Sequence, residues 1–429
     1  MSIGLFGKKS KVGERRQMQP KDPERCKTAV EAWYARSRAT ADTYDVFLSL
    51  TDEGIQDFGT DAEMVAWLRD RDGSGDPAAT TILGVMHEEG LGVPRSEEAA
   101  VSFYRRAAEQ KYAPAMNCLG NSYRLGRGVP ISYESALDWY RRAADLGCAR
   151  AEGRLGEIYA KGLGVERSDS EAVEHYAEAS EKGDALGQNG LGLMCQKGRG
   201  TPRMESEAAR LYRKAAEQGF HEAEYNIGWM CYNGVGVKQS DSEAAAWFGK
   251  AADHGDAWAQ CSLGNMYREG RGVPKSDAKA AELFRKSAEQ GYRVAQNNLA
   301  FMYSEGLGVE KSYAEALTWY RKAAEQGHPG AQCTLGLMHY SGAGTPQSYE
   351  EAFRWLKKAA ESGDPRSCLY VAAMYEKGEG VAKSLVDARE WYRSAADQDE
   401  DFDVRRKAEE ALKRYRREAP APACPIARP

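Results

Sequence analysis

The stretch AWAQCSLGNMYREGRGVPKSDAKAAELFRKSAEQGY, residues 257–292, decides the fold of this chain. Its 36-residue pattern occurs nine times in register, with no insertion or deletion between copies. The copies begin at Pro77, Ala113, Ala149, Ala185, His221, Ala257, Arg293, Pro329 and Pro365. Because a fixed period of this length is the signature of stacked structural repeats, the sequence predicts a solenoid rather than separate globular domains.

The first half of each copy is predicted to be a helix. In the quoted copy its apolar stripe consists of Ala259, Leu263, Met266 and Tyr267. These residues recur at helical spacing and therefore share one face. Gly264 lies on that stripe and allows a neighbouring helix to approach closely. Gly270 and Gly272 are predicted to end the helix in a left-handed conformation and to form a sharp turn.

The second half of each copy is predicted to be another helix, introduced by an N-cap serine in eight of the nine copies. Met204 takes the place of that serine in the fourth copy. The helix pattern is shown whole by Ala316, Trp319, Tyr320, Ala323 and Ala324. A single helix pair cannot bury this stripe alone, so the copies must stack on one another.

The motifs Leu-Gly-x-Met-Tyr, Gly-x-Gly-Val and Trp-Tyr-x-Lys-Ala-Ala, all in register over residues 77–400, resemble the Sel-1-like repeat family. This family is a relative of the tetratricopeptide repeats. The resemblance implies an all-α, right-handed superhelix of antiparallel helix pairs whose first helices line the concave side. The prediction is thus nine 36-residue helix-turn-helix repeats with degenerate capping helices, acting as a non-enzymatic scaffold or adaptor.

The segments outside the repeats are predicted to cap them or to be disordered. Trp67-Leu68 falls eight whole periods before Trp355-Leu356, which indicates a degenerate repeat before residue 77. A further helix is expected over residues 22–40. The expected organisation is a disordered basic tail (1–20), a helical cap with a degenerate repeat (21–76), the nine repeats (77–400), a closing helix (401–418) and a disordered Pro-rich tail (419–429).

Composition restricts the class of partner. The net charge is -5 and the isoelectric point is about 5.9, so nothing favours nucleic acid as a ligand. No apolar run is long enough to span a membrane, and the N-terminus lacks the order of a secretory signal. The nine cysteines include no CxxC pair, which favours reduced structural thiols over a disulfide framework. We therefore expect a cytoplasmic monomer that binds a protein or peptide.

The candidate binding residues lie on the first helices, at positions 2, 5, 9 and 12 of the repeat, opposite the buried stripe. The candidates are Tyr225, Trp229, Tyr232, Trp258, Asn265, Asn297, Phe301, Tyr340, Asn121 and Asn189. Large aromatic residues are unusual on a face expected to be polar, and Asn pairs with peptide backbone as donor and acceptor. Groove Asn and aromatic residues are commonly read as peptide-contacting in the family. The alternative is that these residues pack against the neighbouring first helix.

No motif indicates catalysis, a cofactor or a metal. The chain has no HExxH motif, and its Gly-x-Gly pairs follow helices in every copy, as turn glycines do. One alternative comes from a secreted, cysteine-rich branch of the family linked to β-lactam binding or hydrolysis. That branch pairs a Cys in the Ala-Ala motif with a Cys eight residues later. Here Cys368 matches the second position but Ala360 occupies the first.

Two basic clusters leave further alternatives open. Lys8, Lys9, Lys11, Arg15 and Arg16 would give weak membrane association. The closing helix carries a second cluster, which either contacts an acidic partner or forms a solvated face.

Overall fold

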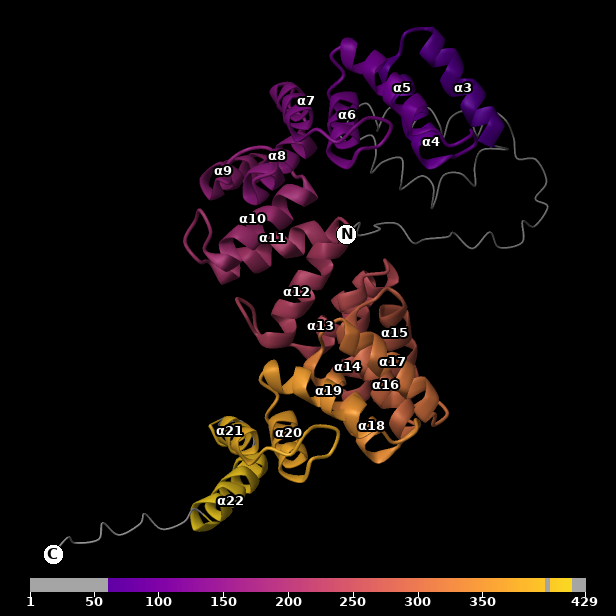
Figure 1. The fold of residues 1–429 in the computed structure, drawn as a ribbon. Helices are drawn as coiled ribbons and strands as arrows, with labels where there is room; N and C mark the ends of the chain where they lie inside the picture. The colour runs from indigo at the N-terminus through magenta and orange to yellow at the C-terminus, as the bar shows by residue number, and fades with distance from the viewer. Residues whose placement is uncertain (1–60, 398–401, 419–429) are drawn as a thin grey trace, which may run out of the picture. The chain divides into compact units, whose positions relative to one another are not determined.

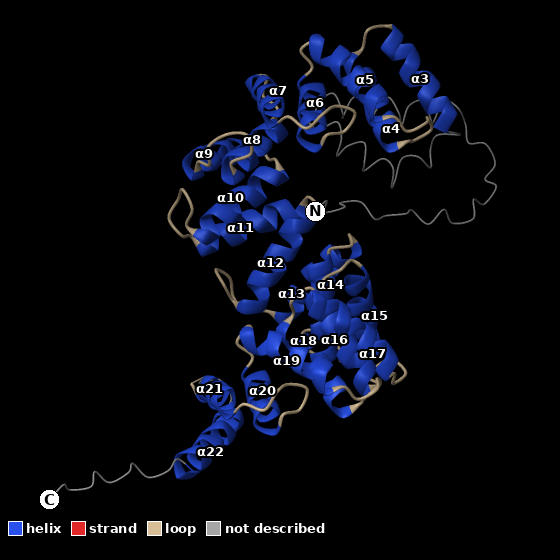
Figure 2. Cartoon of the chain, in the orientation of Figure 1, coloured by secondary structure: helices blue, strands red, loops and turns tan. Residues whose placement is uncertain are grey.

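The structure, a computed structural model, describes residues 61–397 and 402–418 (Figure 1). Every regular element in these two ranges is an α-helix, and they contain no strand (Figure 2). Contacts divide the chain into two compact units, residues 1–240 and 241–429. The boundary falls between the two helices of the fifth repeat. The sequence predicts one continuous body, and its unbroken period gives no sign of this boundary.

The described part of the first unit contains ten helices. They are α3 (Asp61–Gly73), α4 (Pro77–Glu89), α5 (Glu97–Glu109), α6 (Ala113–Leu125), α7 (Tyr133–Asp145), α8 (Ala149–Lys161), α9 (Asp169–Glu181), α10 (Ala185–Lys197), α11 (Glu205–Glu217) and α12 (His221–Asn233). The even-numbered helices from α4 are the first helices of their repeats, and the odd-numbered helices from α5 are the second helices.

The described part of the second unit also contains ten helices. They are α13 (Asp241–Asp253), α14 (Ala257–Glu269), α15 (Asp277–Glu289), α16 (Arg293–Glu305), α17 (Tyr313–Glu325), α18 (Pro329–Ser341), α19 (Tyr349–Glu361), α20 (Pro365–Lys377), α21 (Leu385–Ala396) and α22 (Phe402–Glu418). Within each unit, consecutive helices pack against each other in chain order. The fold is therefore an all-α solenoid, as the repeat predicts.

The ends of the helices follow the predicted signals. The Ser276 hydroxyl accepts a hydrogen bond from the backbone N–H of Lys279 at 3.3 Å, which caps the N-terminus of α15. At the end of α14, Gly270 adopts a left-handed conformation with φ of 73°, and its N–H bonds to the carbonyl of Met266. Met204, at the start of α11, makes no side-chain cap hydrogen bond.

The glycine in the middle of the first helix makes room for an aromatic ring of the second helix. A Cβ on Gly264 would lie 2.7 Å from the Phe284 ring, and one on Gly120 would lie 2.6 Å from the Tyr140 ring. Both rings are fully buried. The glycine thus allows the close helix packing that the sequence predicts, and the ring fills the space.

In the repeats after the first, the second glycine of the Gly-x-Gly pair lies against the second helix of the repeat before it. A Cβ on Gly272 would lie 2.2 Å from the backbone oxygen of Asp241, the first residue of α13. Gly128, Gly200, Gly236, Gly308 and Gly380 make the same close approach to the preceding second helix. This glycine is therefore required by contact between repeats as well as by its positive φ.

Two flanking helices lie where the sequence places a cap. Helix α3 carries the buried Leu68 and packs on α4, and α22 buries Val404, Ala408 and Ala411 against its neighbours. The helix expected over 22–40 and the tails expected over 1–20 and 419–429 lie outside the described residues. None of the described helices is both long enough and apolar enough to cross a membrane.

Candidate binding faces of the first helices

The first helices lie close to one another on one side of each row. Helix α4 contacts α6, and α8 contacts α10, although a second helix separates each pair in the chain. Positions 2, 5, 6, 9 and 12 of the first helices are opposite the buried stripe, and we call the surface they form the first-helix face. Each unit carries its own first-helix face, so the predicted site residues fall into two groups.

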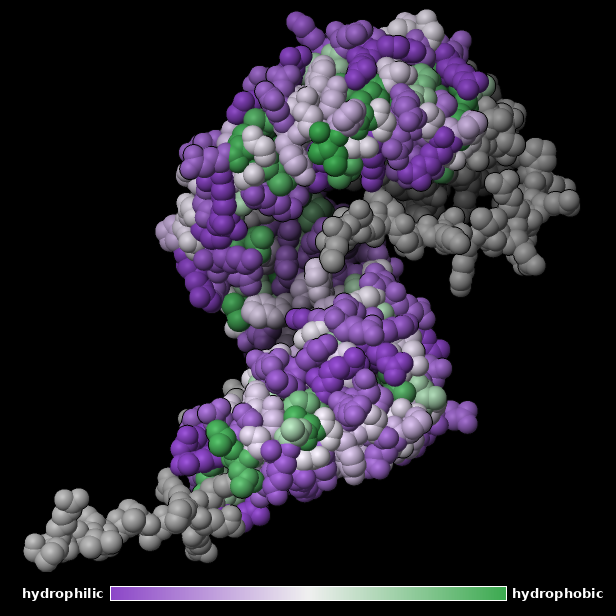
Figure 3. Space-filling view, in the orientation of Figure 1, coloured by the Kyte–Doolittle hydropathy of each residue, from purple (hydrophilic) through white to green (hydrophobic). Residues whose placement is uncertain are grey.

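The first-helix face of the second unit exposes three large aromatic side chains, Trp258, Phe301 and Tyr370. Trp258 on α14 is 54% exposed and Phe301 on α16 is 39% exposed. The Trp258 ring stands edge-on to Tyr292, with ring centroids 6.4 Å apart. Most of the surface visible in Figure 3 is hydrophilic, and its hydrophobic residues form small separate groups. Among the described residues, the other exposed rings are Trp229 on α12, Tyr313 at the start of α17 and Phe402 at the start of α22.

The predicted asparagines of the second unit pair with an asparagine that the sequence interpretation missed. Asn298 on α16 donates a hydrogen bond to the side-chain oxygen of Asn265 on α14, at 3.4 Å. Asn297 donates weakly to Asn298 at 3.5 Å. Asn298 occupies position 6, next to the position 5 that we selected. These amides thus link adjacent first helices, and all three are half-buried.

Tyr340 lies in an aromatic and charged cluster near the end of α18. Its hydroxyl bonds to a Glu379 carboxylate oxygen at 2.8 Å, and Lys377 lies 3.4 Å from the same hydroxyl. Its ring packs edge-on against Tyr349 and Tyr370, at centroid distances of 5.2 and 6.2 Å. Tyr340 therefore has a packing role, and Tyr370 is the more exposed ring at 37%.

The first unit carries the other aromatic group, on α12. Trp229 is 39% exposed, whereas Tyr225 and Tyr232 are half-buried. Asn226, on the same helix, donates to the Asn189 side-chain oxygen on α10 at 2.9 Å. The structure thus brings Asn189 to the helix that carries the predicted aromatic patch.

Asn121 has an internal partner of a different kind. The buried Tyr140 hydroxyl donates to the Asn121 side-chain oxygen at 2.8 Å. In other repeats the equivalent tyrosine donates to position 12, as Tyr104 does to Glu88 and Tyr212 does to Gln196. In this repeat position 12 is Arg124, which offers no acceptor. Asn121, at position 9, therefore accepts the hydrogen bond of the second-helix tyrosine instead.

A charged cluster on α8 was absent from the predicted site. Arg154 donates to Glu157 at 2.9 Å and Lys161 donates to the other Glu157 oxygen at 2.6 Å. Arg150, one turn earlier, lies 2.7 Å from an Asp184 carboxylate oxygen. The same position rule that selected the aromatic residues points to Arg150 and Glu157, at positions 2 and 9. Our selection favoured aromatic and amide side chains and omitted them.

The Glu157 carboxylate is held ionised in this cluster. Burial opposes its ionisation, but the charges of Arg154, Arg124 and Lys161 and the Lys161 hydrogen bond outweigh burial, so its pKa falls to about 2. Burial is also the main influence on Tyr140, and it raises the pKa of that hydroxyl. The cluster therefore combines several positive charges with the Glu157 carboxylate, both of whose oxygens already accept hydrogen bonds.

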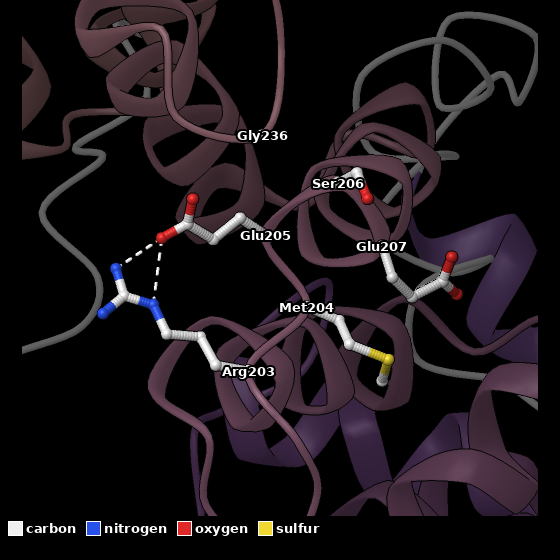
Figure 4. Close-up of a pocket in the computed structure, with 6 residues that line it drawn as sticks. All are labelled: Arg203, Met204, Glu205, Ser206, Glu207 and Gly236. Carbon is white, nitrogen blue, oxygen red and sulfur yellow. Dashed lines mark hydrogen bonds and ion pairs between the residues drawn. The ribbon is translucent and has the colours of Figure 1, made fainter.

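A shallow hollow of about 600 Å³ lies elsewhere, at the N-terminus of α11 (Figure 4). It is lined by Arg203, Met204, Glu205, Ser206, Glu207 and Gly236. Arg203 is paired with Glu205, and Glu207 is paired with Arg210. It lies where the turn between α10 and α11 meets the corresponding turn of the next repeat at Gly236.

The cysteines in the described residues are buried and form no disulfide. Cys195 and Cys231 are both buried at 2% or less exposure. Cys368 lies with its sulfur 3.8 Å from the backbone oxygen of Ala360. Since Ala360 has no sulfur, the pairing found in the cysteine-rich branch has no equivalent at this position.

Comparisons with known proteins agree on the repeat. The family described as Sel1 repeat matches nine segments, 77–112, 113–148, 149–184, 185–220, 221–256, 259–292, 293–328, 329–364 and 365–400. A comparison with curated proteins found no match.

Two solved structures are similar over most of the chain. One is a Sel1 repeat protein from Oxalobacter formigenes, with 30% identity, a TM-score of 0.54, and coverage of 73% of this chain and 89% of that chain. The other is a protective antigen of uropathogenic Escherichia coli with an SLR fold, with 28% identity, a TM-score of 0.51, and coverage of 85% and 99%. Members of this family generally act as protein-interaction scaffolds. The chain belongs to the Sel1 repeat family.

Proposed function

We propose that this protein is a non-enzymatic scaffold that binds a peptide or protein segment on its first-helix faces. The observation that carries the proposal is the exposure of Trp229, Trp258 and Phe301 on those faces. A large aromatic side chain left in water supplies binding energy when a partner covers it.

Two tryptophans of the second helices differ from these three, although Tyr313 at the start of α17 is 43% exposed. Trp139 and Trp319 are half-buried, and a cation covers each ring, Arg142 at 4.8 Å and Lys322 at 4.0 Å. These two rings are therefore less exposed than the three first-helix rings, and a cation of the same chain already covers each of them. Their lower exposure favours the first-helix faces as the binding surface.

The polar groups beside the exposed rings suit a peptide backbone. Asn265, Asn297 and Asn298 each have donor and acceptor atoms, and their mutual bonds of 3.4 and 3.5 Å are long. A bound peptide can replace these long hydrogen bonds with shorter ones between its backbone and the asparagine side chains. The protein would then recognise the peptide through its backbone.

Site-directed variants test the proposal in the full chain. Trp229→Ala with Tyr232→Ala, and separately Phe301→Ala, are expected to abolish or strongly weaken capture of a crosslinked partner. The melting temperature should stay close to that of the wild type, because Trp229 and Phe301 are exposed.

The matched control is Trp319→Ala, which removes a ring of the second helices. It should lower the melting temperature more than Phe301→Ala and leave capture intact. If the first-helix variants melt many degrees lower, these rings are packing residues, and the assignment of the binding surface is wrong.

A further inference from the structure

The charged cluster on α6 and α8 has more positive than negative charge. Its cations are Arg124, Arg150, Arg154 and Lys161, and its carboxylates are Glu157 and Asp184. Asp184 pairs with Arg150, and Glu157 is shared by Arg154 and Lys161. Arg124 makes a side-chain hydrogen bond with the Tyr140 hydroxyl and its charge lowers the pKa of Glu157, but it forms no ion pair with a carboxylate of the described residues. On the preceding first helix, Glu88 at the equivalent position 12 pairs with Arg127 at 2.6 Å.

Three buried polar atoms in this region have no hydrogen-bond partner among the described residues. They are the Nε atoms of Arg124 and Arg154 and the side-chain oxygen of Asn117. Asn117 is only 6% exposed and lies on α6 at position 5. Buried polar atoms are costly to leave unpaired, so three of them on α6 and α8 point to a ligand.

A comparison within the chain shows what is different here. In the fourth and fifth repeats, positions 5 and 6 of adjacent first helices are Asn189 and Asn226, which bond to each other at 2.9 Å. In the second and third repeats the same two positions are Asn117 and Arg154. Arg154 donates to Glu157 instead, and the Asn117 oxygen is left without a donor.

We infer that Arg124 and Arg154 bind a carboxylate of the partner peptide, while the Asn117 side-chain oxygen accepts one of its backbone N–H groups. The inference rests on the proposed function, because it names the chemistry of the peptide bound at α6 and α8. Arginine donors suit a carboxylate in geometry and in charge.

The spacing along α6 fits an extended peptide. Asn117 lies seven residues before Arg124, or about 10 Å along the helix axis. That distance corresponds to roughly three residues of an extended chain. A peptide that runs along α6 therefore places a carboxylate at Arg124 about three residues away from the N–H that reaches Asn117.

The test uses the full-length protein and two synthetic random-peptide libraries. One library has amidated C-termini, so that only Asp and Glu side chains supply carboxylates, and the other has free C-termini. Peptides selected by the wild type are then titrated against Arg124→Gln, Arg124→Lys and Arg105→Gln. Arg105 is the matched control, because this exposed second-helix arginine also contacts a tyrosine hydroxyl, that of Tyr123 at 3.0 Å.

The expected result is enrichment of carboxylates and a loss of affinity of about tenfold or more in Arg124→Gln. Arg124→Lys should retain part of the affinity, and Arg105→Gln should retain all of it. Enrichment in the amidated library identifies an acidic side chain, and enrichment in the free-acid library alone identifies a C-terminal carboxylate. Circular dichroism melting confirms that each variant is folded.

Two outcomes would overturn the inference, and they are distinguishable. If peptides are selected without carboxylate preference, bind Arg124→Gln as well as the wild type and depend on Phe301, the inference fails and the proposed function stands. If neither library yields a binding peptide, the proposed function fails together with the inference.

Discussion

At the scale of single residues, two glycines with the same backbone conformation have different tasks. In the seventh repeat Gly308 has φ of 66° and Gly327 has φ of 77°. A Cβ on Gly308 would lie 2.3 Å from the backbone of Asp277, whereas a Cβ on Gly327 would meet nothing within 4 Å. Both need the left-handed conformation, but Gly308 alone also needs the absence of a side chain.

This difference predicts unequal effects of alanine. Gly327→Ala should lower the free energy of unfolding by about 1–2 kcal/mol, from backbone strain alone. Gly308→Ala should lower the free energy of unfolding by about 1–3 kcal/mol more than Gly327→Ala does, because the contact between repeats must open. Chemical denaturation of the two variants measures both values. Equal losses would show that the close approach to Asp277 has no energetic importance.

A second residue-scale prediction concerns acid. The pKa of Glu157 is lowered to about 2 from 4.5, so its ionised form stabilises the fold at pH above 4.5. That stabilisation, on the order of 3 kcal/mol, is lost as the pH falls from 4.5 through 2. The stability advantage of the wild type over Glu157→Gln should therefore shrink across this pH range. Thermal melts at several pH values measure it, and a constant difference between the two proteins would contradict the prediction.

At the scale of helices, the cap residue is the clearest variable between repeats. Most second helices begin with a serine whose hydroxyl accepts a backbone N–H, as Ser276 does for Lys279. Met204 leaves α11 without this bond and is 40% exposed. The start of α11 is unchanged all the same, because its packing against α10 and α12 positions it.

Met204→Ser should consequently stabilise the protein. A restored N-cap is worth about 1 kcal/mol, and Ser276→Ala in α15 should cost a similar amount. Hydrogen exchange of the first α11 amides, together with the midpoint of denaturation, measures the change. No gain in Met204→Ser would mean that solvent already satisfies these amides equally well.

Glutamine pairs tie the two helices of a repeat together. Gln290, which ends α15, donates to the buried Gln260 on α14 at 2.9 Å, and Gln326 donates to Gln296 in the same way at 2.8 Å. In the second repeat the same two positions hold Met116 and Leu146. Either an amide pair or an apolar pair thus suits these positions.

This equivalence predicts coupling between the two positions. Gln260→Met alone should cost about 1 kcal/mol, since it removes the partner of Gln290. Adding Gln290→Leu should recover part of that loss. A double-mutant cycle measures the coupling, and strictly additive effects would show that the two side chains act independently.

At the scale of the whole chain, the sequence predicted the helices well because each of their signals is local. Ser276 caps, Gly270 terminates, and Gly264 faces Phe284, all within one 36-residue period. The boundary after residue 240 was not predictable, because the period runs through it without a change of pattern. That boundary depends on how closely neighbouring repeats contact each other, and the 36-residue period carries no information about those contacts.

The site was predicted less completely for a related reason. The position rule identified the face and its exposed rings, Trp229, Trp258 and Phe301. It could not assign partners, because whether Asn121 is free depends on Arg124, three residues away, and on the tyrosine of the second helix. Arg154 and Asn298 were missed because position 6 was not selected.

The central claim is that partners bind the first-helix faces, and site-specific photo-crosslinking tests it most directly. A benzophenone amino acid is placed at Trp229 or Phe301 on the first helices, and at Trp139 or Trp319 on the second helices. We predict that partner crosslinks form from the two first-helix positions and not from the two second-helix positions. Crosslinks that form mainly from Trp139 and Trp319 would contradict the account.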